Sequence, residues 1–125
     1  MKCWNYRDGA PWVPVRLSGA RIISEWAFID TGASYCVLHP KLASVLKLKN
    51  LRDEKLHGFG SKESVPTTIA ELEIEVNSFR ELVEVACIEE EYYSETLPEI
   101  IIGRNFLNKY LITLNGERIC IETKT

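Results

Sequence analysis

The segment from residue 28 to residue 38, Phe-Ile-Asp-Thr-Gly-Ala-Ser-Tyr-Cys-Val-Leu, places an acid, a hydroxyl and a glycine between two apolar runs with the composition of strands. Burying a carboxylate at the end of a strand is costly unless it is paired, hydrogen-bonded or protonated. Sequences that do so often use the perturbed acid for chemistry. Asp30-Thr31-Gly32 also suits an ordinary turn, in which the aspartate bonds its own backbone. The triplet alone therefore leaves a chemical and a structural interpretation open.

Alternating or apolar runs separated by turn residues predict a chain made mostly of strands. The predicted strands cover residues 12–17, 21–29, 35–38, 51–59, 65–76, 80–88, 110–114 and 118–122. A short helix is expected over residues 39–46, with Pro40 in its first turn, and residues 106–110 can form one or two helical turns. Asn115-Gly116 is a strong hairpin signal between the last two strands. The pattern predicts an all-β fold, either a closed or a sandwich-like domain, with two short helices.

Composition and charge narrow the class of protein. The chain has 125 residues, enough for one domain with a sizeable core, and 46% of them are hydrophobic while 26% are charged. A net charge of −3 argues against nucleic acid as the main partner. No window has the length of a membrane span, and the first residues lack the apolar core of a signal peptide. We expect neither a nucleic-acid nor a membrane partner.

The four cysteines are scattered along the chain, and the sequence has only two histidines. This spacing indicates neither a zinc site nor a dense disulfide framework, so no metal or cofactor is expected. Free cysteines are typical of a reducing compartment, which favours a cytoplasmic location. Residues 1–11 are expected to form a flexible N-terminal arm, followed by a single domain over residues 12–125.

A second motif changes the interpretation of the first. Residues 99–107 read Glu-Ile-Ile-Ile-Gly-Arg-Asn-Phe-Leu, an apolar run that ends in Gly, Arg and Asn. The two segments together resemble the retropepsin family of aspartic proteases, the half-sized, dimer-forming enzymes of retroviruses, retrotransposons and cellular relatives. In that family, Asp-Thr-Gly-Ala is followed late in the chain by Ile-Ile-Gly-Arg-Asn or Ile-Ile-Gly-Arg-Asp. The resemblance runs from about Val13 to Glu122 and implies the closed retropepsin barrel, with a flap hairpin and one lobe per chain.

The chemistry of this family sets a requirement that one copy of the chain does not meet. Peptide hydrolysis by this route needs two carboxyl groups about a hydrogen bond apart, sharing one proton, with a water between them. The sequence has one Asp-Thr-Gly, no Asp-Ser-Gly, and no room for a second lobe. A protease must therefore be a symmetric homodimer, in which Asp30 meets its two-fold mate and acts on a peptide or protein substrate.

The same resemblance implies roles for the residues around Asp30. Thr31 would bond across the two-fold axis, Gly32 would let the backbone approach the substrate, and Ala33 would border the pocket. Arg104 would brace the active-site strand, commonly through an acid two places after the catalytic glycine. Ser34 stands at that position, so the usual ion pair is absent and the partner of Arg104 stays open, with a surface-facing side chain as the alternative.

A flap and a set of pocket residues are also implied. The loop that contains Gly58, Phe59 and Gly60 is expected to be the flap, although an ordinary hairpin loop is the alternative, and His57 is expected to take no catalytic part. By their place in the motifs, three apolar residues would line substrate pockets or belong to the core: Phe28, Val37 and Ile101. Glu99 departs from the retroviral pattern, and in the cleft it would disfavour acidic substrate side chains and favour basic ones.

The C-terminal hairpin, residues 111–122, is more apolar than an exposed hairpin tolerates. It must pack on its own barrel or pair with its mate, and a likeness to cellular retropepsin-like proteins favours the dimer interface. Two functions remain open: a homodimeric aspartic endopeptidase, or an inactive or weak module of the same fold that binds peptides or only dimerises. An unrelated β domain, in which Asp30 is a turn residue, is the third possibility.

Overall fold

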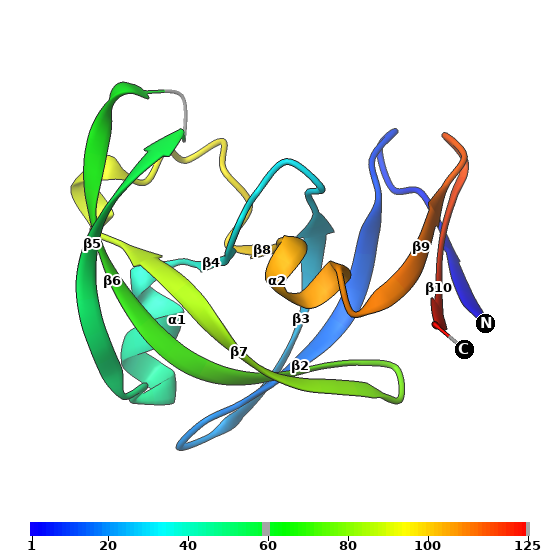
Figure 1. Cartoon of the computed structure of the whole chain (residues 1–125), viewed down its shortest axis with the longest axis horizontal. Coiled ribbons are helices and arrows are strands. Elements are labelled where there is room, and N and C mark those ends of the chain that lie inside the picture. Colours follow the sequence, from blue (N-terminus) through cyan, green and yellow to red (C-terminus); the bar gives the residue numbers. More distant parts are fainter. Residues whose placement is uncertain (59–60, 125) are drawn as a thin grey trace.

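The computed structural model of the protein describes residues 1–58 and 61–124, with the backbone alone for residue 58 and residues 61–63. Seven strands form the main sheet: β2 (Trp12–Ser18), β3 (Ile22–Ile29), β4 (Cys36–Leu38), β5 (Asn50–Gly58), β6 (Ser61–Val76), β7 (Phe79–Ile88) and β8 (Ile100–Ile102). Their order is β2-β3-β8-β4-β7-β6-β5, and β2 also pairs with β6 (Figure 1). Six strands therefore close into a barrel, and β5 stays outside it as the partner of β6.

Two α-helices and a short 3₁₀ turn (Glu90–Tyr92) complete this part of the fold. Helix α1 (Pro40–Leu46) begins at His39, whose Nδ1 accepts a hydrogen bond from the backbone N–H of Lys41 at 3.0 Å. Helix α2 (Arg104–Leu107) follows β8 directly. The prediction of a closed, all-β barrel with two short helices is confirmed.

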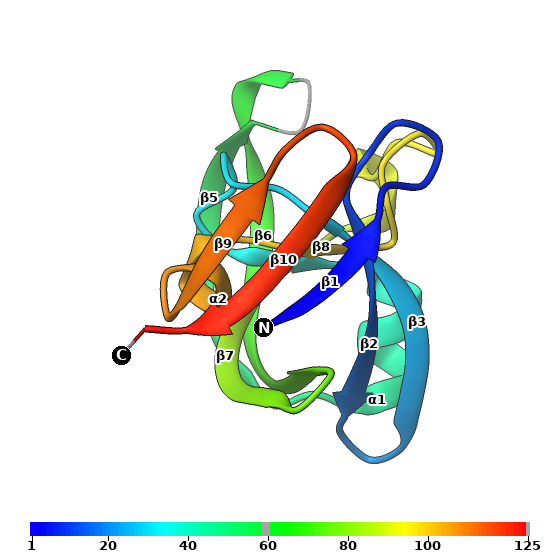
Figure 2. The ribbon, with the colours of Figure 1, turned by 90° about the vertical axis from the view of Figure 1, so that its right-hand side faces the viewer.

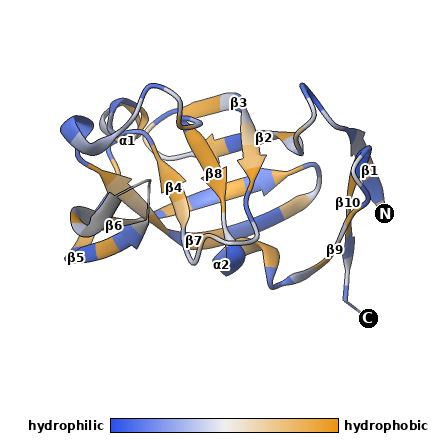
Figure 3. Ribbon diagram, turned by 90° about the horizontal axis from the view of Figure 1, so that it is seen from above, coloured by the Kyte–Doolittle hydropathy of each residue, from blue (hydrophilic) through white to orange (hydrophobic). Residues whose placement is uncertain are grey.

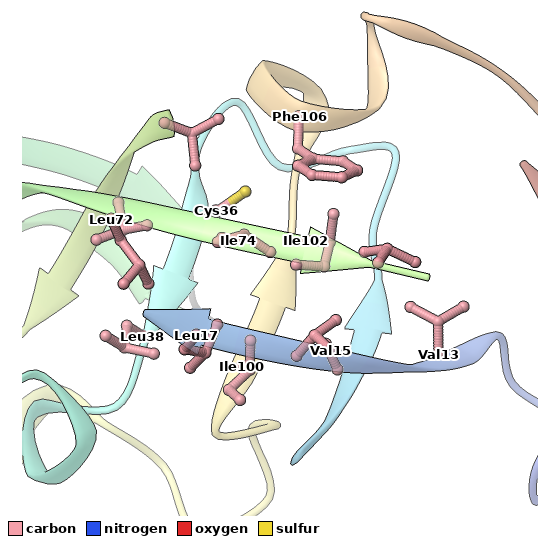
Figure 4. Close-up of a cluster of buried hydrophobic side chains, with 14 of the residues drawn as sticks. Val13, Val15, Leu17, Cys36, Leu38, Leu72, Ile74, Ile100, Ile102 and Phe106 are labelled. Carbon is pink, nitrogen blue, oxygen red and sulfur yellow. The ribbon is translucent and has the colours of Figure 1, made fainter. Parts of the chain in front are cut away.

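The barrel interior is filled by the inward faces of its strands. Along β2, Val13, Val15 and Leu17 are buried while the alternate residues are not, as expected for a strand with one face on the core. All three residues of β8 are buried, because its neighbours β3 and β4 cover its edges and its two faces pack into two different apolar clusters. Figure 3 shows the resulting apolar centre, and Figure 4 shows Phe106 of α2 packed over one end of it.

A second, three-stranded sheet contains the two chain ends. It consists of β1 (Lys2–Asn5), β9 (Tyr110–Leu114) and β10 (Arg118–Thr123), in the order β1-β10-β9. It stands at one end of the barrel (Figure 1 and Figure 2). The hairpin predicted around Asn115-Gly116 is confirmed, since β9 and β10 are antiparallel neighbours.

The flexible arm predicted for residues 1–11 is wrong for residues 2–5, which form β1. Cys3 lies directly opposite Cys120, and the two form a disulfide. Trp4 lies opposite Ile119 and packs against the main core. The partner strand lies at the far end of the sequence, so no local pattern revealed this pairing.

The disulfide also bears on the cellular compartment of the protein. Disulfides persist mainly in oxidising compartments, so the Cys3–Cys120 bond weighs against the cytoplasmic location predicted from the scattered cysteines. That location stays a prediction. Among the described residues, no helix has the length and apolar character needed to cross a membrane.

Candidate active site

Residues 30–35, which begin with Asp-Thr-Gly, form the candidate active-site loop, also called the Asp30 loop. The loop lies where β3 ends, beside the end of β8. Strands β3 and β8 are parallel neighbours, with Ile29 opposite Ile102, and the backbone N–H of Asp30 donates to the carbonyl of Ile102 at 3.0 Å. The Oδ1 atom of Asp30 accepts a hydrogen bond from the backbone N–H of Gly32 at 2.9 Å. The fold thus joins the two sequence motifs, and the loop's own backbone orients the carboxyl group.

Gly103 allows the second motif to approach the loop closely. Its backbone lies so near the loop that a Cβ atom there would be 2.3 Å from the carbonyl oxygen of Tyr35 and 2.9 Å from that of Ala33. The next residue, Arg104, donates its backbone N–H to the Ala33 carbonyl at 2.8 Å. Only glycine fits this approach without displacing the active-site loop.

The structure identifies the partner of Arg104. One guanidinium nitrogen of Arg104 donates to the hydroxyl of Ser34 at 2.8 Å. Both residues are exposed. A neutral hydroxyl therefore takes the position where the family commonly has an acid, and the link between the two motifs is kept as a hydrogen bond.

Asn105 supplies a second link, which sequence reasoning missed. Its Oδ1 accepts from the backbone N–H of Cys36 at 2.9 Å, and its Nδ2 donates to the carbonyl of Glu84 at 2.6 Å. The signal was present in the sequence, because Asn105 completes the Gly-Arg-Asn run. Its short amide can satisfy backbone groups of two strands at once.

A cleft of about 890 Å³ opens in front of Asp30. Its lining consists of Asp30, Gly32, Ala33, Ser34, Tyr35, Val37, Leu56, His57, Ser94, Thr96, Leu97 and Ile101. Of the expected pocket residues, Val37 and Ile101 line it and also belong to a buried apolar cluster. Asp30 is the one acidic side chain in this lining, as far as the described residues define it.

Two expected pocket residues are not part of the lining. Phe28 packs against Trp12, with ring centroids 5.4 Å apart. Glu99 pairs with Lys41 at 3.8 Å, and its carbonyl accepts from the backbone of His39 at 2.8 Å. Its predicted effect on substrate charge therefore has no support from its position. The lining residues Tyr35, Leu56 and Leu97 were not predicted, because strand registers and loop paths bring them to the cleft.

The predicted flap corresponds to the hairpin formed by β5 and β6, in which Gly58 pairs with Ser61. Phe59 and Gly60 lie outside the described residues. His57, expected to have no catalytic part, lies in the cleft lining on β5, and Leu56 lies beside it. The end of this hairpin nearest its turn therefore forms one wall of the cleft, and the Asp30 loop forms another.

The remaining reactive groups near the site have no evident catalytic use. Burial raises the pKa of the Cys36 thiol to about 12, although its sulfur accepts from the backbone N–H of Gly103 at 3.4 Å. Such a thiol is neutral at physiological pH and unreactive. In the part of the chain that the structure describes, no group of three or more His, Cys, Asp or Glu side chains could hold a metal ion.

Comparison with known proteins agrees with this geometry. The family model described as aspartyl protease matches residues 13–106. Among solved structures, the EIAV protease in complex with the inhibitor HBY-793 matches with a TM-score of 0.57 and 20% sequence identity, over 81% of this chain and 88% of that one. A search of curated proteins found no match. The structural match shows that the fold is retropepsin-like. The family match, which covers three quarters of the sequence, shows that the chain belongs to the aspartyl protease family.

Proposed function

We propose that this protein is a homodimeric aspartic endopeptidase, in which Asp30 and the same residue of a second copy form the catalytic pair. The observation that carries the proposal is the Asp30 carboxyl group, oriented by the Gly32 backbone at 2.9 Å and facing an open cleft. No second carboxylate lines that cleft among the described residues. The other member of the pair must therefore come from a partner, and a two-fold axis beside the loop supplies it.

The chemistry would follow from one proton shared between two close carboxyl groups. The ionised aspartate takes a proton from a water as the water oxygen attacks the peptide carbonyl carbon. The protonated aspartate gives its proton to the carbonyl oxygen. When the tetrahedral intermediate collapses, the C–N bond breaks, the leaving nitrogen takes a proton from the pair, and one hydroxyl of the intermediate returns a proton to the pair as it becomes the new carboxyl group. Two peptides result, and no cofactor is required.

The neighbouring residues support this proposal through their positions. Thr31 and Gly32 are exposed next to Asp30, as expected of a loop that meets its two-fold mate. Ala33 lies in the cleft lining, where a larger side chain would narrow the space for a peptide backbone. Arg104, which is not part of the cleft lining, donates to Ser34, which is, and this bond holds the loop.

We further propose that the terminal sheet contributes to the dimer interface. Strand β9 is the edge of that sheet, and its Leu111 and Leu114 remain 51% and 40% exposed. On β10, Ile119 and Ile121 are fully buried, so the hairpin packs on its own chain and still leaves an apolar edge. An exposed apolar edge strand is a typical site of pairing with a second copy.

The test is cleavage of a mixed peptide library between about pH 4 and pH 7, the range in which a shared-proton carboxyl pair can act. Wild type and Asp30→Asn would be compared at concentrations at which sedimentation shows dimers. We expect wild type to cleave, Asp30→Asn to lose activity by at least about a hundredfold, and a statine-type transition-state mimic to inhibit. A dimer that cleaves nothing would instead favour the peptide-binding module of the same fold.

A further inference from the structure

Tyr35 connects the two walls of the cleft through its hydroxyl group. It lies on the active-site loop and lines the cleft. Its hydroxyl donates to Oε2 of Glu54 at 3.2 Å and accepts from the guanidinium of Arg52 at 3.3 Å. Both partners belong to β5, the strand that carries Leu56 and His57 into the opposite wall.

Arg52 is itself held in place by two carboxylates. Its Nη1 and Nη2 donate to the two oxygens of Glu84 at 2.9 and 2.6 Å, and its Nε donates to Glu54 at 3.0 Å. Two parallel bonds to one carboxylate fix the orientation of a guanidinium more firmly than a single contact does. The bonding raises the pKa of Arg52 and lowers that of Glu84, so the pair stays ionised.

Glu84 in turn is tied to the Gly-Arg-Asn motif. Its backbone carbonyl accepts from Asn105 at 2.6 Å, and Asn105 also holds the backbone of Cys36. Residues of the active-site loop, β5, β7 and α2 are thus joined by one continuous set of hydrogen bonds. We call Tyr35, Arg52, Glu54 and Glu84 the cross-wall cluster.

We propose that Tyr35 and Arg52 are positioning residues that set the distance between the active-site loop and β5, and thereby the fit of a peptide in the cleft. This proposal rests on the proposed function, since it concerns the same cleft. All three guanidinium nitrogens of Arg52 are engaged by the cluster. Arg52 therefore acts through the spacing of the walls, rather than as a free cation offered to the substrate.

The kinetic test uses variants that remove the bonds and keep the bulk. Tyr35→Phe keeps the ring in the lining and removes the hydroxyl, and Arg52→Met keeps most of the side-chain length. For each, we expect KM for a cleaved peptide to rise about 3- to 10-fold, the effect of losing one or two hydrogen bonds, with kcat changed less than about twofold. The double variant should be little worse than Arg52→Met alone, because both changes break the same connection.

Arg80→Met is the matched control. Arg80 makes a comparable surface pair with Glu75, at 3.0 and 2.8 Å, but neither residue lines the cleft. Loss of the Arg80–Glu75 pair should leave KM for the same peptide unchanged. The proposal is overturned if Tyr35→Phe and Arg52→Met also leave KM unchanged, or if they lower kcat instead.

Hydrogen–deuterium exchange separates this proposal from the proposed function. In Arg52→Met, amides of residues 53–57 and 33–36 should exchange at least about threefold faster than in wild type, and in Arg80→Met they should not. If wild type cleaves no peptide, the proposed function fails while the exchange comparison still tests the cluster. Unchanged exchange in Arg52→Met would overturn the positioning role by itself.

Discussion

At the scale of single residues, Gly103 determines how closely the second motif can lie against the active-site loop. A side chain at this position would meet backbone atoms of Tyr35 and Ala33, which cannot rotate away as side chains do. We expect Gly103→Ala to lower the free energy of unfolding by about 1–3 kcal/mol, as overpacking does, and to abolish peptide cleavage. Thermal denaturation and a peptide assay would check both expectations.

The matched control is Gly9→Asn. Gly9 has a φ of +75°, and a Cβ atom added there would meet nothing within 4 Å. Asparagine tolerates this backbone conformation better than most other residues. The stability and activity of this variant should stay close to those of wild type. Equal behaviour of the two variants would contradict the role given to Gly103.

The cysteines give a second expectation at this scale. Burial raises the pKa of Cys36 to about 12 and that of Cys87 to about 11, so both thiols are protonated and slow to react at neutral pH. With iodoacetamide and no reductant, we expect Cys87, the less buried thiol, to be labelled before Cys36. Cys3 and Cys120 should be labelled only after reduction. Peptide mass spectrometry would check this order, and labelling of Cys3 in the unreduced protein would contradict the disulfide.

At the scale of elements, the contact of β5 with β7 should depend on pH. The hydrogen bonds from Arg52 lower the pKa of Glu84 from its ordinary value of 4.5. A carboxylate whose pKa is lower in the folded state stabilises that state above its unfolded pKa, and the contribution is lost as the pH falls through the folded value. The decrease in melting temperature caused by Arg52→Met should therefore be largest at neutral pH and become smaller below about pH 4.

Glu84→Gln provides the control for this pH dependence. With Glu84 replaced, the effect of Arg52→Met should vary less with pH in the acid range, because Glu54 alone remains as a carboxylate partner of Arg52. A difference that persists unchanged in wild type to the lowest pH at which the protein folds would show that Glu84 is not the group responsible.

At the scale of the whole molecule, the features encoded locally were predictable. Strand alternation, as in Val13, Val15 and Leu17, predicted the barrel strands, and the two motifs predicted the family. Contacts between distant segments were not predictable, because they depend on register and on barrel closure. The pairing of Cys3 with Cys120 and the bonds from Arg52 to Glu84 are of this kind. Each joins residues far apart in the sequence, and the residues around them do not specify the partner.

In the proposed function, two copies of the chain share one active site. The most direct test mixes wild type with Asp30→Asn, after sedimentation has shown that both form dimers, and lets subunits exchange at constant total concentration. If each site needs Asp30 from both copies, an equal mixture should retain about a quarter of the all-wild-type activity, since only wild-type pairs cleave. A value of about one half would mean that each chain acts alone, and would contradict the shared site.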